Sequence, residues 1–364
     1  MLAVAPAFRR LAKRFSRGYT PRSMRQGARL PVGKLPPRLL ESLLASCPIP
    51  KSSRVVLGPR LGEDAAVIDW GNRYLVAKTD PITFTAERLG WYAVNINAND
   101  LATLGARPRW FLATLLLPEG RATPALVRRI FRDALRACRA LGVTLCGGHT
   151  EVTAGLDRPV LVGQMLGEVE KSRLVLKESQ QPGDLVILTK GVAIEGTSIL
   201  AREKAGALRR KLGDALLRRA RRLLFNPGIS VVRDARLAAA SGGVRAMHDP
   251  TEGGLLAGLY ELARAGRAGL RIQKENVPVL KETLAFSRVL GFDPLALIAS
   301  GALLVVAGPA AAPRLLETFA RNKITAAIIG EVCREREGIE IIEQGRARPL
   351  RPPARDEIAR LLDD

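Results

Sequence analysis

The chain has 364 residues, 34 Gly, 23 Pro and a formal net charge of +22, and this length and composition favour two α/β or α+β domains over a helical bundle. No apolar run approaches the roughly 20 residues that a membrane-spanning helix needs, so we expect no membrane partner. The four Cys lack C-x-x-C spacing, which argues against a zinc site or disulfides and predicts a cytoplasmic protein.

The positive charge is densest in two segments. Residues 1–32 contain no acid, and we interpret them as a disordered basic arm; a transit peptide, or an over-extended start with Met24 as the first residue, are the alternatives. The run 208–225 predicts a helix with a basic outer face. Nucleic acid stays open as a partner, but no aromatic residues interleave with these charges as stacking platforms would.

From residue 33 onward, strand-like and helical patterns alternate. The expected elements are a short helix within 34–48, strands near 54–57, 65–69 and 73–79, a helix at 87–104, a strand at 110–118, a helix at 124–141 and a strand at 143–146. The helix at 124–141 is the best defined, because Thr123 supplies an N-cap, Pro124 fits the first turn and Gly142 ends the helix.

A polar connector near 170–182 divides the chain into two parts. The elements expected after it are a strand at 185–189, the basic helix, a helix ending at 240, and strands near 268–273, 302–307 and 325–333. We therefore predict an α/β (α+β) fold with domains at 33–172 and 173–345, followed by a C-terminal tail at 346–364.

Three acids of the first part share one setting. Asp64, Asp80 and Asp100 each follow a strand or lie in a helix among small or apolar residues. Buried carboxylates are costly unless paired or bound to a cation, and oxygen ligands without Cys suit Mg²⁺. The alternative for Asp64 and Asp80 is that they cap turns.

Two glycine-containing motifs contain the only histidines of the chain. In CGGHTEVT, Gly147 and Gly148 predict a turn after a strand, where backbone N–H groups approach an anion. In HDPTEGGL, two glycines lead into a helix whose N-terminus would hold a phosphate. A capped helix start explains the second motif without a ligand, and structural hydrogen bonds explain both histidines.

Six segments, in this order, resemble the aminoimidazole-ribonucleotide synthetase, or PurM-like, superfamily over about residues 33–345. They are GEDAAVI, KTDPITF, NANDLATLGARP, CGGHTEVT, PGDLVIL and MHDPTEGGL. HDPTEGGL together with DPLALIASGALLVV looks most like the branch of the hydrogenase-maturation protein HypE. The resemblance implies a two-domain fold with ATP in a cleft, and a homodimer in which the N-terminal domains pair their strands.

The resemblance also implies roles for individual residues. Asp64, Asp80 and Asp100 would bind Mg²⁺ and phosphate, with Asn99, Gly147, Gly148 and Thr150 beside the nucleotide. The catalytic candidates are His149, Glu151, His248 and Asp249.

Several residues depart from the HypE pattern. His149 stands where HypE has a metal-binding Asp, and a neutral imidazole is a poor Mg²⁺ ligand; the site would hold one metal fewer, recruit Glu151, or use His149 on a phosphate. HypE carries its carbamoyl group on a C-terminal Cys, whereas the last Cys here is Cys333. Glu195 stands where HypE commonly has an Asp-His pair.

These features predict an ATP- and Mg²⁺-dependent enzyme that activates an unidentified small acceptor by phosphoryl transfer. The first alternative is carbamoyl dehydration in hydrogenase maturation, with the thiol supplied by a partner protein. The second is a non-enzymatic nucleic-acid-binding protein on the same fold.

Overall fold

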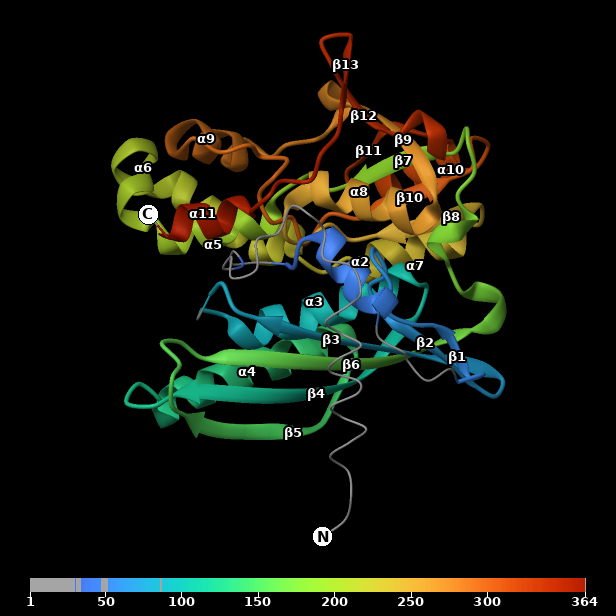
Figure 1. Cartoon of the computed structure of the whole chain (residues 1–364). Coiled ribbons are helices and arrows are strands. Elements are labelled where there is room, and N and C mark those ends of the chain that lie inside the picture. Colours follow the sequence, from blue (N-terminus) through green and yellow to red (C-terminus); the bar gives the residue numbers. More distant parts are fainter. Residues whose placement is uncertain (1–29, 31–33, 47–51, 86, 364) are drawn as a thin grey trace.

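A computed structural model describes residue 30 and residues 34–46, 52–85 and 87–363. Nearly all of the predicted basic arm, including Met24, lies outside these residues. In the described part of the chain, no helix is both long enough and apolar enough to cross a membrane. Figure 1 shows two layered domains that combine helices and sheets, which confirms the predicted fold class.

The N-terminal domain is built on a six-stranded sheet in the order β1-β2-β3-β6-β4-β5. Its strands are β1 (Val55–Leu57), β2 (Ala66–Trp70), β3 (Arg73–Ile82), β4 (Arg107–Pro118), β5 (Thr144–Thr153) and β6 (Val160–Glu170). β4 and β5 pair in parallel, and the other neighbours are antiparallel. β5 lies at one edge of the sheet, and most of its residues are exposed.

The helices of this domain differ in how they are buried. α2 (Pro37–Ser46) precedes the sheet, whereas α3 (Leu89–Thr103) and α4 (Pro124–Leu141) pack together and contact its strands. α3 is buried over nearly its whole length because it lies between the sheet and the C-terminal domain (Figure 1). α4 buries one stripe with Ile130 and Ala134 and exposes arginines on the other side.

The C-terminal domain contains a seven-stranded sheet in the order β13-β12-β9-β11-β7-β10-β8. Its strands are β7 (Leu185–Thr189), β8 (Val244–His248), β9 (Ala268–Gln273), β10 (Leu304–Ala307), β11 (Ala326–Arg334), β12 (Ile339–Glu343) and β13 (Arg346–Pro349). Its α-helices are α5 (Ile194–Glu203), α6 (Ala205–Arg222), α7 (Val232–Ser241), α8 (Gly254–Gly266), α9 (Lys281–Leu290), α10 (Ala312–Arg321) and α11 (Glu357–Asp363). β7 and β10 are interior strands of this sheet and almost wholly buried, as their apolar sequences indicate.

Short helical turns join these elements. They are η1 (Lys171–Arg173) and η2 (Lys177–Ser179) in the connector, η3 (Leu224–Gly228) after α6, η4 (Lys274–Asn276) after β9 and η5 (Glu335–Glu337) after β11. The connector lies against the second domain, because η2 contacts α8 and β8.

Residues 346–363, which we expected as a separate tail, are part of the folded C-terminal domain. β13 pairs with β12, so the expected boundary at 345 falls within this hairpin. In α11, Ile358 and Leu361 are buried. The sequence alone did not indicate these two elements, because the segment is rich in Arg and Pro and its short strand and helix contain few apolar residues.

Candidate functional site

Acidic side chains from both domains meet at the interface between them. Asp64 comes from the loop between β1 and β2, Asp80 from β3 and Asp100 from α3. Asp249 comes from the second domain, directly after His248 at the end of β8. We call Asp64, Asp80, Asp100 and Asp249 the acid cluster.

Asp64 is held by two cationic side chains. Its Oδ2 accepts hydrogen bonds from Lys177 Nζ at 2.5 Å and His248 Nδ1 at 2.9 Å. The other ring nitrogen of His248, Nε2, lies 3.0 Å from Glu261 Oε2, so the protonated ring donates to both carboxylates. Burial alone would raise the pKa of Asp64, but His248 and Lys177 outweigh burial and hold this pKa well below its ordinary value. In this arrangement His248 orients Asp64, and the catalytic role implied for His248 stays a prediction.

Lys78 connects the other two acids of the N-terminal domain. Its Nζ lies 3.1 Å from Asp100 Oδ2 and 3.6 Å from Asp80 Oδ2. Burial raises the pKa of Asp100 to about 7, although Lys78 opposes this shift. The sequence reasoning missed Lys78, yet a signal existed: it is two residues before Asp80 on a predicted strand, so both side chains share one face.

Asp249 is the least compensated member of the acid cluster. It is 1% exposed, and neither carboxylate oxygen has a hydrogen-bond partner among the described residues. Burial, followed by the nearby Asp100 and Asp64, raises the pKa of Asp249 well above its ordinary value. Such a carboxylate costs free energy unless a cation joins it.

The donor set of the acid cluster fits a hard divalent cation. Ligand atoms of Asp64, His248 and Asp249 lie within 4.8 Å of one another. Because His248 is occupied by two carboxylates, the donors left are carboxylate oxygens of Asp64 and Asp249, with Asp100 beside them. Oxygen-only sites of this kind suit Mg²⁺.

The start of α8, which we considered as a phosphate site, is occupied by the protein itself. Asp356 accepts hydrogen bonds from the backbone N–H groups of Gly253 and Ile358. Burial raises the pKa of Asp356 to about 6, and these N–H donors oppose the shift. The alternative of a capped helix start therefore describes HDPTEGGL better, and the cap comes from a segment about 100 residues further along the chain.

CGGHTEVT does not form the turn that its glycines predict. All of these residues lie within β5, and the pairing with β4 shifts register beside them. Gly148 has φ 147°, and a Cβ at this position would come within 2.0 Å of the Ala113 carbonyl oxygen. The glycine therefore permits a close approach of β4 rather than a turn around an anion.

His149 and Glu151 lie away from the acid cluster within one chain. The pairing of β3 with β6, β6 with β4 and β4 with β5 aligns Asp80 with Gly148. Three strand spacings of about 4.8 Å separate these two residues by roughly 14 Å. Because side chains alternate between the faces of a sheet, His149 and Glu151 project from the face opposite to Asp80. There His149 Nε2 lies 3.0 Å from Glu151 Oε2, with both side chains exposed.

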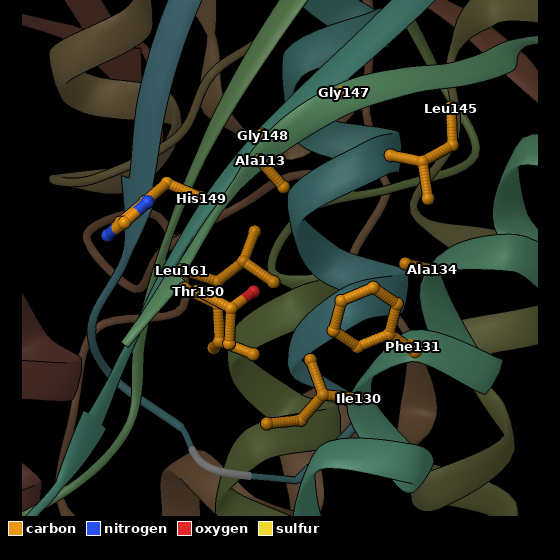
Figure 2. Close-up of a pocket in the computed structure, with 11 residues that line it drawn as sticks. Ala113, Ile130, Phe131, Ala134, Leu145, Gly147, Gly148, His149, Thr150 and Leu161 are labelled. Carbon is orange, nitrogen blue, oxygen red and sulfur yellow. The ribbon is translucent and has the colours of Figure 1, made fainter. Parts of the chain in front are cut away.

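A cavity of about 250 Å³ lies between β5 and α4. Figure 2 shows Ile130, Phe131 and Leu145 on its apolar walls, with the imidazole of His149 directed away from them. Thr150 also lines this cavity, as do both glycines of β5. These β5 residues lie apart from the acid cluster within one chain. The nucleotide contacts implied for them stay a prediction.

Asn99 has a different role from the one that the resemblance implied. Its Nδ2 donates to the Ile229 carbonyl oxygen, and its Oδ1 accepts from the Val231 N–H, both at 2.8 Å. Both acceptor and donor groups of this amide thus join α3 to the C-terminal domain. This geometry makes Asn99 a contact between domains, and the nucleotide contact implied for it stays a prediction.

Comparisons with known proteins agree with this architecture. The model of AIR synthase related protein, N-terminal domain, matches residues 62–169, and that of the C-terminal domain matches residues 181–343. The carbamoyl dehydratase HypE of Rhodobacter capsulatus is 31% identical over 284 residues, which cover 76% of this chain and 80% of that protein. The chain belongs to the AIR synthase-related family and is an enzyme of that class.

Within this family, the chain resembles the HypE proteins. A putative hydrogenase expression/formation protein of Methanocaldococcus jannaschii is 26% identical over 288 residues, covering 77% of this chain and 82% of the relative. A structure of HypE in complex with ATP has a TM-score of 0.68 at 24% identity, covering 83% of this chain and 92% of that one. ThiL complexed with AMPPCP and TMP has a TM-score of 0.64 at 20% identity, covering 85% and 92%. At these identities the two structures establish the fold.

Proposed function

We propose that this protein is an ATP- and Mg²⁺-dependent enzyme that activates a small acceptor by phosphoryl transfer. The observation that carries this proposal is the acid cluster, in which the buried carboxylate of Asp249 has no partner among the described residues and lies beside Asp64. The bound ATP of a HypE structure and the bound AMPPCP of a ThiL structure support a nucleotide in the same fold.

Each member of the site has a defined task in this proposal. His248 and Lys177 fix the carboxylate of Asp64, and Lys78 holds Asp80 and Asp100. Oxygens from both domains are thereby oriented before a ligand arrives, which lowers the cost of reorganisation. Neutralisation of phosphate charge is the chemistry that Mg²⁺ supplies when bound to these carboxylates.

Isothermal titration with ATP and Mg²⁺ tests the proposal. We expect micromolar to millimolar binding that requires Mg²⁺ and weakens at least about tenfold in Asp249→Asn and Asp100→Asn, because each removes a carboxylate charge facing the cation. Asp157→Asn is the matched control, since the exposed Asp157 side chain pairs only with Arg158 in the described structure. Absence of binding by the wild type, or equal binding by all variants, contradicts the proposal.

The homodimer implied by the resemblance remains part of the proposal. Two features support it: β5 is an exposed edge strand, and the sheet face with His149 and Glu151 is also exposed. A second copy packed against this surface would bury both. Light scattering after size-exclusion chromatography should give twice the 39.3 kDa chain mass. A Trp110→Asp variant, exposed on β4 and on the same sheet face as Thr114, the register partner of His149, should shift the protein toward monomer; a wild-type monomer contradicts the dimer.

The acid cluster does not identify the acceptor. One alternative is a carbamoyl group that is dehydrated in hydrogenase maturation. Among the described cysteines, Cys333 is buried in β11, and burial raises the pKa of its thiol. Cys146 is exposed but lies within β5, so neither residue is a C-terminal thiol. In this alternative the carbamoyl group arrives on a thiol of a partner protein, and the solved HypE–HypF complex supports this type of partner. Co-purification of a carbamoyltransferase with this chain tests that answer, and ATP turnover without such a partner favours a free small acceptor.

A second candidate function, nucleic-acid binding, is favoured by one surface feature. Arg88, Arg132 and Arg136 line a cavity of about 480 Å³ beside α4, and the Arg88 and Arg136 guanidinium groups lie over the ring of Phe225 at 5.9 and 5.3 Å. Aromatic and basic groups that are far apart in the sequence therefore meet, as in single-strand binding sites. Fluorescence anisotropy with a single-stranded oligonucleotide should detect salt-dependent binding that Arg132→Glu weakens; no binding at low salt removes this candidate.

A further inference from the structure

A larger cavity between the two domains lies apart from the acid cluster. Its volume is about 600 Å³, which is within the range of cavities that bind small molecules. Residues of the N-terminal domain form one side of it, and Lys204 and Leu362 of the C-terminal domain lie on the other. None of the four acid-cluster residues is among the described residues that line this cavity. We call it the basic cleft.

Four basic side chains from separate segments converge on the basic cleft. Arg121 lies just before α4 and Arg129 lies within this helix. Arg158 comes from the loop between β5 and β6, and Lys204 lies between α5 and α6. Because like charges repel one another, a cavity that gathers them attracts an anion.

Two carboxylates in the basic cleft compensate only part of this positive charge. The acidic lining residues are Asp157 and Glu203, so four basic and two acidic side chains leave a formal charge of +2. Asp157 Oδ2 pairs with Arg158 Nη2 at 3.0 Å. Arg129 and Lys204, which also line the cleft, form no ion pair in the described part of the chain. These two cationic groups are therefore available to a ligand.

Apolar side chains form much of the remaining wall of the basic cleft. Phe84, Leu126 and Leu362 line it and are partly buried against the hydrophobic core. Pro118 and Pro159 extend the same wall. Contact with these groups removes the apolar surface of a ligand from water, which favours binding. The cleft therefore fits a molecule that combines an anionic head with an apolar body better than it fits a bare inorganic ion.

We propose that the basic cleft binds a small amphipathic organic anion. Its phosphate or carboxylate group would lie between Arg121, Arg129 and Lys204, and its apolar body against Leu126 and Leu362. Guanidinium groups bind both kinds of oxyanion through paired hydrogen bonds. A phosphate dianion matches the formal charge of +2, so we expect it to bind more tightly than a carboxylate. Because groups from both domains hold the ligand, binding also links the domains.

Isothermal titration with phenyl phosphate tests the proposal directly. The full chain is used in EDTA and without nucleotide, at physiological ionic strength, where salt screens long-range attraction. We expect phenyl phosphate to bind most tightly, phenylacetate more weakly because it carries one charge, and inorganic phosphate more weakly because it has no apolar body. Phenylacetamide is the matched control for the apolar contact alone, because it resembles phenylacetate in shape but is neutral, and we expect no binding.

Variants assign the binding to the basic cleft. Arg129→Gln and Lys204→Gln should each weaken phenyl phosphate binding about threefold, because each removes one partly exposed positive charge. The double variant should bind about tenfold more weakly than the wild type. Arg314→Gln is the matched control, since Arg314 is exposed on α10 and does not line the cleft, and it should bind like the wild type. Thermal unfolding checks that each variant is folded.

The outcomes separate this proposal from the nucleotide site. No binding of phenyl phosphate, equal binding of phenylacetamide or inorganic phosphate, or equal affinity of the double variant and Arg314→Gln overturns the basic cleft as a site for amphipathic anions. The order of phenyl phosphate and phenylacetate assigns the anionic group of the ligand. Because nucleotide and Mg²⁺ are absent, loss of ATP binding in its own titration would contradict the phosphoryl-transfer proposal and leave this site in place.

Discussion

At the scale of single residues, Asp249 of the acid cluster and Glu195 of α5 share one property. Asp249 and Glu195 are both carboxyl groups that burial leaves without a counterpart in the described structure. In a protein selected for stability alone, such groups would be replaced, since an unpartnered buried carboxyl costs free energy. A cation bound at the acid cluster would supply the counterpart that Asp249 lacks.

The stability cost of Asp249 is directly measurable. We expect Asp249→Asn to raise the free energy of unfolding by about 1–3 kcal/mol in EDTA, because it removes a buried unpartnered charge. In excess Mg²⁺ the wild type should gain stability by ligand binding, whereas the variant should gain little. Urea denaturation in both conditions provides the measurement, and a variant that is less stable in EDTA would contradict this account of Asp249.

Glu195 should make stability depend on pH. Burial raises its pKa to about 8 from an ordinary value of 4.5, although Ser300 lowers it slightly. Between these values the folded protein holds a proton that the unfolded chain has released, so stability falls as the pH rises through this window.

Replacement of Glu195 by Gln removes this contribution. The free energy of unfolding of Glu195→Gln relative to wild type should therefore rise between about pH 5.5 and 7.5, by up to about 1.4 kcal/mol per pH unit. Urea denaturation at both pH values measures the difference, with the exposed Glu317→Gln as the control. Parallel pH dependence of Glu195→Gln and wild type would show that Glu195 is ionised in the folded protein.

At the scale of elements, the helices followed the sequence closely. α4 begins and ends where Thr123, Pro124 and Gly142 predicted, with the Thr123 side chain accepting from the Leu126 N–H and Gly142 at φ 66°. These signals are local, because a cap and a terminating glycine act on the backbone of the same turn. β5 was predicted to end at Cys146, because glycine pairs usually mark turns, but a glycine within a strand also permits close approach of a neighbour.

The tight contact of β5 with β4 gives a prediction for this element. Gly148→Ala should lower stability by about 2 kcal/mol or more, because its Cβ would meet the Ala113 carbonyl oxygen at 2.0 Å on a backbone with φ 147°. Gly147→Ala is the matched control, since its nearest neighbour would be Leu112 Cδ2 at an ordinary 3.6 Å. Melting temperatures compare the two variants, and equal values would refute the close-approach explanation.

At the scale of the whole molecule, α3 joins the two domains. Asn99 on this buried helix has its partners in the loop before α7, at Ile229 and Val231. Asn95 instead donates to Trp91 within its own helix. This amide, together with the pairing of His248 with Asp64, thus orients the two halves of the acid cluster.

Removal of this amide should loosen the domain interface. Asn99→Ala leaves a buried carbonyl and a buried N–H without partners, at a cost of about 1–3 kcal/mol for each group. Hydrogen exchange of the Val231 amide should accelerate more than in Asn95→Ala, which leaves the interface contacts in place. Unchanged protection of Val231 would mean that packing alone holds the domains.

The sequence by itself determined the fold class and several members of the site. Asp64, Asp80, Asp100 and Asp249 were identified from the order of short motifs, and local caps and apolar periodicity placed most elements. Motifs, caps and apolar periodicity each span only a few residues, so the local sequence is sufficient to recognise them.

Only the tertiary structure decided which of these residues work together. Lys177 and His248 reach Asp64 over 113 and 184 residues of chain, and no local pattern reports such contacts. The tertiary structure also places His149 on the sheet face opposite to Asp80. At the start of α8, the Asp356 carboxylate accepts a hydrogen bond from the Gly253 N–H. The physical reason is that the site forms at a domain interface, where geometry depends on how two separately formed cores pack.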